Sequence, residues 1–356
     1  MRKKAISMIL AAALGSALLA GCSSAPKETT AAATTAETTA EEKKEESKAE
    51  ETKAEEKKEE AAGNDMLSGE TGDIAKAGDG KGQKVVLITI DSMDQHWVNM
   101  DKGCKQAAEE LGCDYKWIAP DVKDDAKQIE CVNNAVSAGA QAIIVAANGP
   151  DAISSALREA SDAGVKLIYV DSPANVSAEA TFSTDNNAAG KTAGEEMKKA
   201  LADAGVTSGS IGIINVNAAT DSCVMREEGF RSAFEGTDFE LLETQYGEGD
   251  AAKSQSIAEN YITQGVVGIF GCNEGSTTGA GNAIKASGKD NVIGVGFDKS
   301  DAILGLIDDG YLLCTMAQNP DVMGYEGVKA AVKAINGESL GGAVTDTGVS
   351  VLTKQQ

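Results

Sequence analysis

Two alternating patterns of apolar residues cover most of the chain from about residue 84 onward. Short β-branched runs, such as that at 85–90, are typical of strands buried on both faces. Between them, apolar residues recur three or four positions apart, as expected for helices, and glycines such as Gly112 and Gly139 follow the ends of these segments. The pattern predicts helices between strands near 85–90, 115–118, 142–146, 165–170, 210–216, 239–244, 266–270, 292–297 and 312–317.

Strands that alternate with helices through short connections form parallel sheets joined by right-handed crossovers. The alternation breaks near 181–187 and then resumes with the same rhythm. We therefore expect an α/β protein with two lobes of similar build, split near residue 185. In such sheets ligands bind beyond the carboxyl ends of the strands, so polar residues just after a strand are candidates for a binding site.

The first 21 residues have the pattern of an export signal. Arg2, Lys3 and Lys4 precede an apolar stretch at 5–20 that is short for a membrane span. The stretch ends in Leu19-Ala20-Gly21-Cys22, which resembles a bacterial lipobox, where the peptide is cut before the cysteine and the thiol is acylated. We expect a lipoprotein signal peptide at 1–21 and a lipid anchor at Cys22; the alternative is an ordinary signal peptide with a chance cysteine. Both place the mature protein outside the cytoplasm, and the lipobox attaches it to the cell membrane.

Residues 22–83 form a low-complexity segment rich in Thr, Ala, Glu and Lys. The Glu/Lys block at 41–60 has respectable helix propensity but offers no apolar stripe with which to pack on a core. We interpret the segment as a solvated linker between the lipid anchor and a folded body that begins at residue 84.

Charge and residue counts exclude several kinds of function. Acidic residues outnumber basic ones 55 to 32, which argues against nucleic acid as a partner. His96 is the only histidine, so a two-histidine zinc site is excluded. The six cysteines beyond Cys22 form no CxxC pair, so we expect buried apolar side chains rather than a metal site. Neither a complete phosphate-binding loop nor a dinucleotide fingerprint occurs, because Asp185 and Lys299 stand where glycines are required; we expect no cofactor.

Polar and aromatic residues recur at the predicted strand ends. Fixed carboxylate, guanidinium and amide groups suit the hydroxyls of a polyol, which both donate and accept hydrogen bonds, and an aromatic side chain can cover an apolar sugar face. Each such residue taken alone also fits a helix cap or a turn. The recurrence predicts one polar cleft with an aromatic wall. Its candidate lining residues are Asp91, Asp94, His96, Trp97, Asp171, Ser172, Asn217, Arg226, Asn273, Glu274, Asp298, Gln318 and Asn319.

An ordered set of motifs spans the body. It comprises 96–103 (HWVNMDKG), 167–171 (LIYVD), 183–190 (STDNNAAG), 226–230 (REEGF), 269–274 (IFGCNE), 295–298 (VGFD) and 315–318 (TMAQ). With these motifs the chain resembles the periplasmic sugar-binding proteins of the ribose-binding type, which share their fold with the sensing domains of lactose-repressor-like regulators.

The resemblance implies two lobes joined by three hinge strands, near 183–186, 318–321 and 345–348. It assigns 84–184 plus 319–346 to the N-terminal lobe and 185–318 plus 347–356 to the C-terminal lobe. Carried over position by position, it implies delivery of the sugar to an ABC permease in the membrane. It also implies sugar contacts at Asp94, His96, Trp97, Asp171, Arg226, Asn273, Asp298 and Gln318. We expect a monomer without catalytic residues.

Two departures from the family pattern concern the identity of the ligand. Ribose binders of the family carry an arginine where Ser172 stands, and an aromatic near Gly249. A different pentose, a hexose or a cyclitol is therefore expected, with Asp91 or Glu274 as further candidate contacts.

Two other functions remain open on the sequence. A receptor of the same fold would pass its ligand to a signalling partner. A secreted carbohydrate-active enzyme would use two cleft carboxylates, such as Asp94 and Asp298, as acid and base.

Overall fold

The computed structural model describes residues 77–354. The expected signal peptide at 1–21, the lipidation site Cys22 and nearly all of the expected linker lie outside these residues. Within the described part, no helix is long and apolar enough to cross a membrane.

The first sheet has six strands, and all its strand pairs are parallel. We refer to this sheet and the helices packed on it as the first lobe. Its strand order is β12 (Ala343–Asp346), β5 (Ala180–Ser183), β4 (Lys166–Val170), β3 (Ala142–Val145), β1 (Lys84–Ile88) and β2 (Asp114–Ile118).

Helices cover both faces of this sheet because successive side chains of the buried strands point to opposite faces. Val85 and Leu87 pack with α1 (Gln95–Leu111) and α9 (Pro320–Ile335). Val86 and Ile88 pack on the other face with α2 (Asp125–Ser137) and α3 (Ser154–Asp162). The uninterrupted apolar run that predicted β1 reflects this burial on both sides.

The second sheet has seven strands and a single antiparallel pair, β11 with β13. We refer to this sheet and its helices as the second lobe. Its order is β13 (Val349–Thr353), β11 (Cys314–Gln318), β10 (Ile293–Phe297), β9 (Gly268–Gly271), β6 (Ser208–Asn215) and β7 (Asp238–Leu241), and β8 (Gln245–Tyr246) also pairs with β6. Its helices are α4 (Asn186–Asp203), α5 (Asp221–Ser232), α6 (Ala251–Gln264), α7 (Glu274–Ser287) and α8 (Asp301–Asp308).

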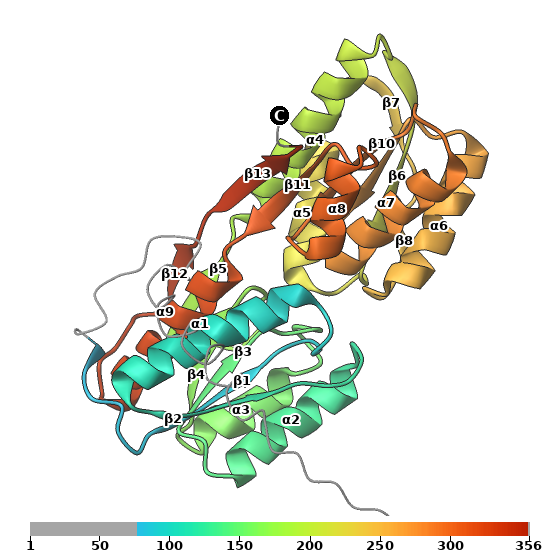
Figure 1. Cartoon of the computed structure of the whole chain (residues 1–356). Coiled ribbons are helices and arrows are strands. Elements are labelled where there is room, and N and C mark those ends of the chain that lie inside the picture. Colours follow the sequence, from blue (N-terminus) through green and yellow to red (C-terminus); the bar gives the residue numbers. More distant parts are fainter. Residues whose placement is uncertain (1–76, 355–356) are drawn as a thin grey trace, which may run out of the picture. The chain divides into compact units, whose positions relative to one another are not determined.

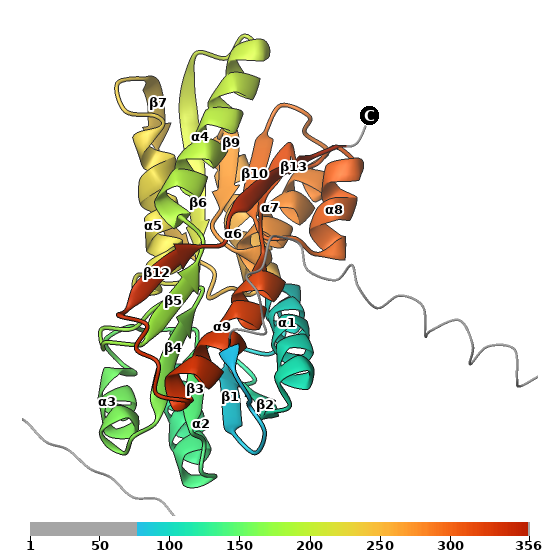
Figure 2. The ribbon, with the colours of Figure 1, turned by 90° about the vertical axis from the view of Figure 1, so that its left-hand side faces the viewer.

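The chain passes between the two sheets in three segments. They connect β5 to α4, β11 to α9, and β12 to β13, and Figure 2 shows the last of these in dark red. The predicted fold class, two similar α/β lobes with a three-strand hinge, is confirmed (Figure 1). The predicted break at 181–187 is wrong in detail, because it contains most of β5 and the first two residues of α4. Four of the six cysteines in the described residues are buried and two are partly exposed, and all six are free.

Candidate ligand-binding site

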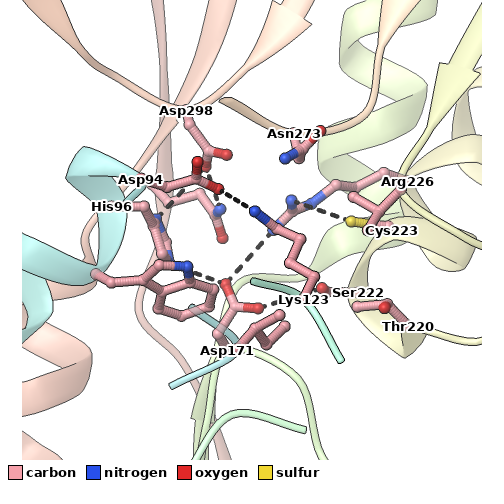
Figure 3. Close-up of a pocket in the computed structure, with 14 residues that line it drawn as sticks. Asp94, His96, Lys123, Asp171, Thr220, Ser222, Cys223, Arg226, Asn273 and Asp298 are labelled. Atoms are coloured by element: carbon pink, nitrogen blue, oxygen red, sulfur yellow. Dashed lines mark hydrogen bonds and ion pairs between the residues drawn. The ribbon is translucent and has the colours of Figure 1, made fainter. Parts of the chain in front are cut away.

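One pocket collects side chains from both lobes at the carboxyl ends of their strands (Figure 3). The empty space of the pocket, with its open mouth included, is about 350 Å³. The structure brings all eight sequence-predicted residues to its wall: Asp94, His96, Trp97, Asp171, Arg226, Asn273, Asp298 and Gln318.

His96 lies between carboxylates of the two lobes. Its Nε2 is 3.0 Å from Oδ2 of Asp171, and its Nδ1 is 3.5 Å from Oδ1 of Asp298. Burial by itself would lower the pKa of His96, but the close contact with Asp171 and the charges of both carboxylates outweigh it and raise the pKa above its usual value. The closed pocket thus favours an imidazolium at its centre.

The two carboxylates that face His96 share an unusual backbone conformation. Asp171 has φ = 57° and Asp298 has φ = 75°, in the left-handed region that few residues other than glycine, asparagine and aspartate adopt. Each follows the last residue of its strand, so this turn directs a carboxylate into the pocket rather than along the strand. Burial raises the pKa of Asp171, but the close contact with His96 and the charges of His96 and Arg226 more than compensate, so the net pKa is lowered.

Three contacts within the second lobe fix the guanidinium of Arg226. Its Nε donates to Oδ1 of Asn186 at 2.8 Å, its Nη1 donates to the carbonyl of Cys272 at 3.1 Å, and its guanidinium lies over the ring of Phe297. Its Nη2 is buried, makes no hydrogen bond within the described residues, and lies 3.6 Å from Oδ2 of Asp171. One buried donor of this fixed group is therefore free to meet a ligand.

Close packing of two helices allows α5 to place Arg226 at this depth. A Cβ on Gly190 of α4 would overlap the carbonyl oxygen of Arg226, and a Cβ on Gly229 of α5 would overlap that of Asn187. The two glycines let the backbones of α4 and α5 approach each other at the position from which the side chain of Arg226 extends.

The remaining predicted residues have partners of their own. Gln318 donates from Nε2 to Oδ1 of Asp298 at 2.6 Å and accepts from the hydroxyl of Thr184 at 2.9 Å. Gln318 and Thr184 lie in two different segments between the lobes, and together they orient the carboxylate of Asp298. Asn273 caps α7 by accepting from the amide of Ser276, which leaves its side-chain NH2 group uncommitted to the cap.

Trp97 lines the pocket but is also part of the core of the first lobe. It is only 4% exposed, and its Nε1 donates to Oδ2 of Asp91 at 3.0 Å. Its ring stands edge-on to His96 at an interplanar angle of 88°. Both interpretations of this residue, core aromatic and pocket wall, thus apply.

Lys123 is the main pocket residue that sequence reasoning missed. Its ammonium lies 2.6 Å from Oδ2 of Asp91 and 3.0 Å from Oδ2 of Asp94, and its side chain is only 11% exposed. Lys123 comes from the loop after β2, so the strand-end rule that found the other residues would have found it there too. Gly249 faces its side chain from the second lobe, where a Cβ would lie 2.5 Å from Cε of Lys123.

Further lining residues come from the start of α5 and from the ends of β1 and β6. They are Ile90, Val216, Thr220, Ser222 and Cys223. Ser222 donates from its hydroxyl to Oδ1 of Asp171 at 3.2 Å. The additional candidate Asp91 pairs with Lys123 and does not line this pocket. The other additional candidate, Glu274, lies at the rim of the cleft, where it contacts the first lobe. Within the part of the chain described, no three histidine, cysteine or acidic side chains form a group that could hold a metal ion.

Comparison with known families identifies the architecture. The model of the periplasmic binding protein domain matches residues 85–339, most of the chain. The chain belongs to the periplasmic binding protein family. The resemblance stated from the sequence motifs is thereby confirmed.

Individual relatives within the family agree with the ribose-binding type. The ribose import binding protein of Haemophilus influenzae is 28% identical over 272 residues, which cover 75% of this chain and 91% of that protein. That of Escherichia coli is 27% identical and covers 72% and 86% respectively.

Solved structures give the same result. A carbohydrate transporter solute-binding protein from Agrobacterium radiobacter, in complex with D-arabinose, has a TM-score of 0.73 at 27% identity and covers 77% of this chain and 95% of its own. An ABC transporter solute-binding protein from Agrobacterium vitis with bound D-fucose has a TM-score of 0.72 at 28% identity and covers 76% and 95%. The relatives and neighbours are binding proteins.

Proposed function

We propose that this chain captures a monosaccharide or a related polyol between its lobes and delivers it to an ABC permease. The observation that carries the proposal is the guanidinium of Arg226, with a buried Nη2 that has no hydrogen-bond partner in the described residues. An unpaired buried donor costs about 1–3 kcal/mol, and more when it is charged. A ligand hydroxyl placed between Arg226 and Asp171 would accept from that donor and donate to the carboxylate.

The rest of the pocket supports a neutral, hydroxylated ligand. Carboxylates of both lobes accept hydrogen bonds, and the NH2 group of Asn273 can donate one. The negative charges of Asp94, Asp171 and Asp298 are balanced by Lys123, Arg226 and a protonated His96, so the pocket has little net charge with which to select an ionic ligand. Relatives named for ribose and neighbours with D-arabinose or D-fucose bound make pentoses and hexoses the first compounds to test.

We propose that the pocket contacts its ligand differently, at least in part, from the ribose binders of this type. Ser172 occupies the position where ribose binders of this type carry an arginine, and it is buried beside the start of α5. Its hydroxyl oxygen accepts from the amide of Ser222 and does not line the pocket, so no guanidinium is available at this position and the pattern of recognised hydroxyls must change.

Calorimetric titration of the purified body with D-ribose, D-arabinose, D-fucose and myo-inositol tests this function. We expect saturable binding of at least one compound and weaker binding of D-ribose. Arg226→Lys keeps the charge but removes the planar donor fork, and should weaken binding at least ~10-fold. No heat and no thermal stabilisation with any pentose, hexose or cyclitol would contradict the proposal.

The three segments between the lobes are the proposed hinge, with lobe boundaries at 184/185, 318/319 and 346/347. Opening about these segments would admit the ligand, and closure would present a different outer surface for the permease to recognise. We assign no catalytic residue and no cofactor to this site, and propose a monomer.

We also propose that the mature chain is held at the extracytoplasmic face of the cell membrane by a lipid on Cys22, with residues 23–83 as the linker. Expression of the full chain with radiolabelled palmitate tests this. Label and partition into the detergent phase are expected for the natural sequence and should both disappear in Cys22→Ser.

A further inference from the structure

Helix α1, whose start forms one wall of the pocket, lacks an N-terminal cap of its own. Asp94 is its N-cap residue, but the side chain of Asp94 makes no capping hydrogen bond and pairs with Lys123 instead. The first turn of α1 contains no acidic residue. The first amides of a helix have no partner within the helix and need one from elsewhere when they are buried.

The missing cap is supplied by the second lobe. Oε1 of Glu274, the first residue of α7, accepts from the amide of Gln95 at 3.0 Å, and Oε2 accepts from the amide of His96 at 3.1 Å. One carboxylate therefore satisfies two successive amides of a helix in the opposite lobe. A carboxylate at this end of a helix is also favoured by the helix dipole.

A second contact runs in the opposite direction. Oε1 of Gln95 accepts from the amide of Asp301, the first residue of α8, at 3.4 Å. Each lobe thus provides an acceptor to the start of a helix in the other. These bonds require the lobes to be as close as they are in this structure, so opening must break them.

We propose that Glu274 is a positioning residue that couples closure of the lobes to the geometry of the pocket, by capping helix α1 from the opposite lobe. The proposal rests on the function proposed above. The helix start that Glu274 holds carries His96 and Trp97 and follows Asp94, so three pocket side chains are oriented by the same backbone. Only the closed protein has the complete cap, and a ligand that favours closure gains its contribution.

The charges around Glu274 couple this contact to pH. The charged groups around Glu274 in the first lobe are Asp91, Asp94, His96, Asp121 and Lys123, and those in the second lobe are Glu248, Asp250, Asp298 and Asp301. Burial, with the charges of Asp94 and Asp298, raises the pKa of Glu274 to about 7 despite the two amides. An exposed glutamate in the open protein would ionise near pH 4.5. Closure should therefore take up protons between these values and be favoured as the pH falls through this range.

Three variants test the proposal, with the tightest-binding compound among D-ribose, D-arabinose and D-fucose as the probe. Glu274→Ala leaves both amides without a partner in the closed state and should raise Kd about 5- to 30-fold, mainly through faster dissociation. Glu274→Gln keeps one acceptor, so it should lose less affinity and show a weaker dependence of Kd on pH between about 5 and 7.5. Glu259→Ala removes an exposed glutamate of α6 that accepts only from Gln255 within its own helix, and should bind like the natural protein.

Hydrogen exchange at the amides of Gln95 and His96 gives a readout that does not depend on a sugar. We expect faster exchange at these two positions in Glu274→Ala and unchanged exchange in the interior of α1. Unchanged affinity, pH dependence and exchange in Glu274→Ala would overturn the proposal, as would an equal loss of stability with and without sugar. If the natural protein binds none of the sugars but the two amides lose protection in Glu274→Ala, the proposed function fails while the cap stands.

Discussion

The imidazole of His96 joins the two lobes, because its Nδ1 lies 3.5 Å from Oδ1 of Asp298 across the cleft. Its other nitrogen meets Asp171 of its own lobe, so a single ring lies between two carboxylates. Protonation of that ring gives both of them a counter-charge. The protonation state of one side chain is therefore linked to how tightly the cleft closes.

The pKa of His96 should lie above its usual value of 6.5 in the closed protein. The stabilisation that the imidazolium provides is complete below about pH 6.5 and is lost as the pH rises through the raised pKa. Because His96 is the only histidine, NMR titration of the imidazole gives one unambiguous curve. Asp298→Asn should move that pKa downward. A pKa at or below 6.5 in the natural protein would contradict this arrangement.

Removing the charge of Asp298 should abolish tight binding without disturbing the backbone. Asparagine tolerates the left-handed conformation at this position, so Asp298→Asn should lower sugar affinity about 10- to 100-fold, the usual cost of losing a charge-assisted hydrogen bond. Asp298→Ala adds backbone strain and should destabilise the ligand-free protein by about 1 kcal/mol more than Asp298→Asn. Calorimetry and urea unfolding measure the two effects separately. Asp309→Asn, at an exposed ion pair with Lys285, is the control and should change neither.

Lys123 should be important for stability as well as for the pocket. Lys123→Met leaves the carboxylates of Asp91 and Asp94 buried side by side without their cation and should cost about 3–5 kcal/mol in the free energy of unfolding. Burial, with the charges of Asp91 and Asp298, already raises the pKa of Asp94 to about 6 against the opposing charge of Lys123, so the variant should be less destabilised at about pH 5 than at about pH 8.

Matched variants isolate the effect of this pair. Adding Asp94→Asn to Lys123→Met should restore part of the lost stability in urea unfolding. Lys127→Met, which removes an exposed lysine from its ion pair with the exposed Asp121, should leave the free energy of unfolding nearly unchanged. Equal losses for Lys123→Met and Lys127→Met would show that the buried pairing has no special role.

The glycines between α4 and α5 should not tolerate a methyl group. In Gly229→Ala the new Cβ would overlap the carbonyl oxygen of Asn187, so the helices must separate, with an expected loss of about 2–4 kcal/mol and weaker sugar binding through displacement of Arg226. Gly305→Ala is a matched control, because Gly305 lies in α8 and an added methyl group there would meet no neighbouring atom within 4 Å. It should stabilise the protein by about 0.5–1 kcal/mol through helix propensity. Thermal unfolding of both variants tests the pair.

Much of the architecture follows from local sequence pattern. The β-branched run at 84–88 forms a strand because its side chains can be buried on both faces of the sheet. Helix α1 ends at Gly112, which adopts a left-handed φ of 73° that glycine tolerates without strain. The strand-end rule and the family motifs together named eight side chains that line one pocket, because the carboxyl ends of parallel strands share one edge of a sheet. These features depend on a residue's neighbours in the chain.

Other features exist only through contacts between distant segments. β5 and β12 lie in stretches with little local strand signal, and they form because neighbouring strands offer unpaired backbone groups. Lys123 has its role because Asp91 and Asp94, about 30 positions earlier, lie within 3.0 Å of it, and Glu274 caps a helix that begins at Gln95. Hydrophobic periodicity is a property of one segment and can be read from it, whereas an ion pair or a cap between segments depends on how the whole chain folds.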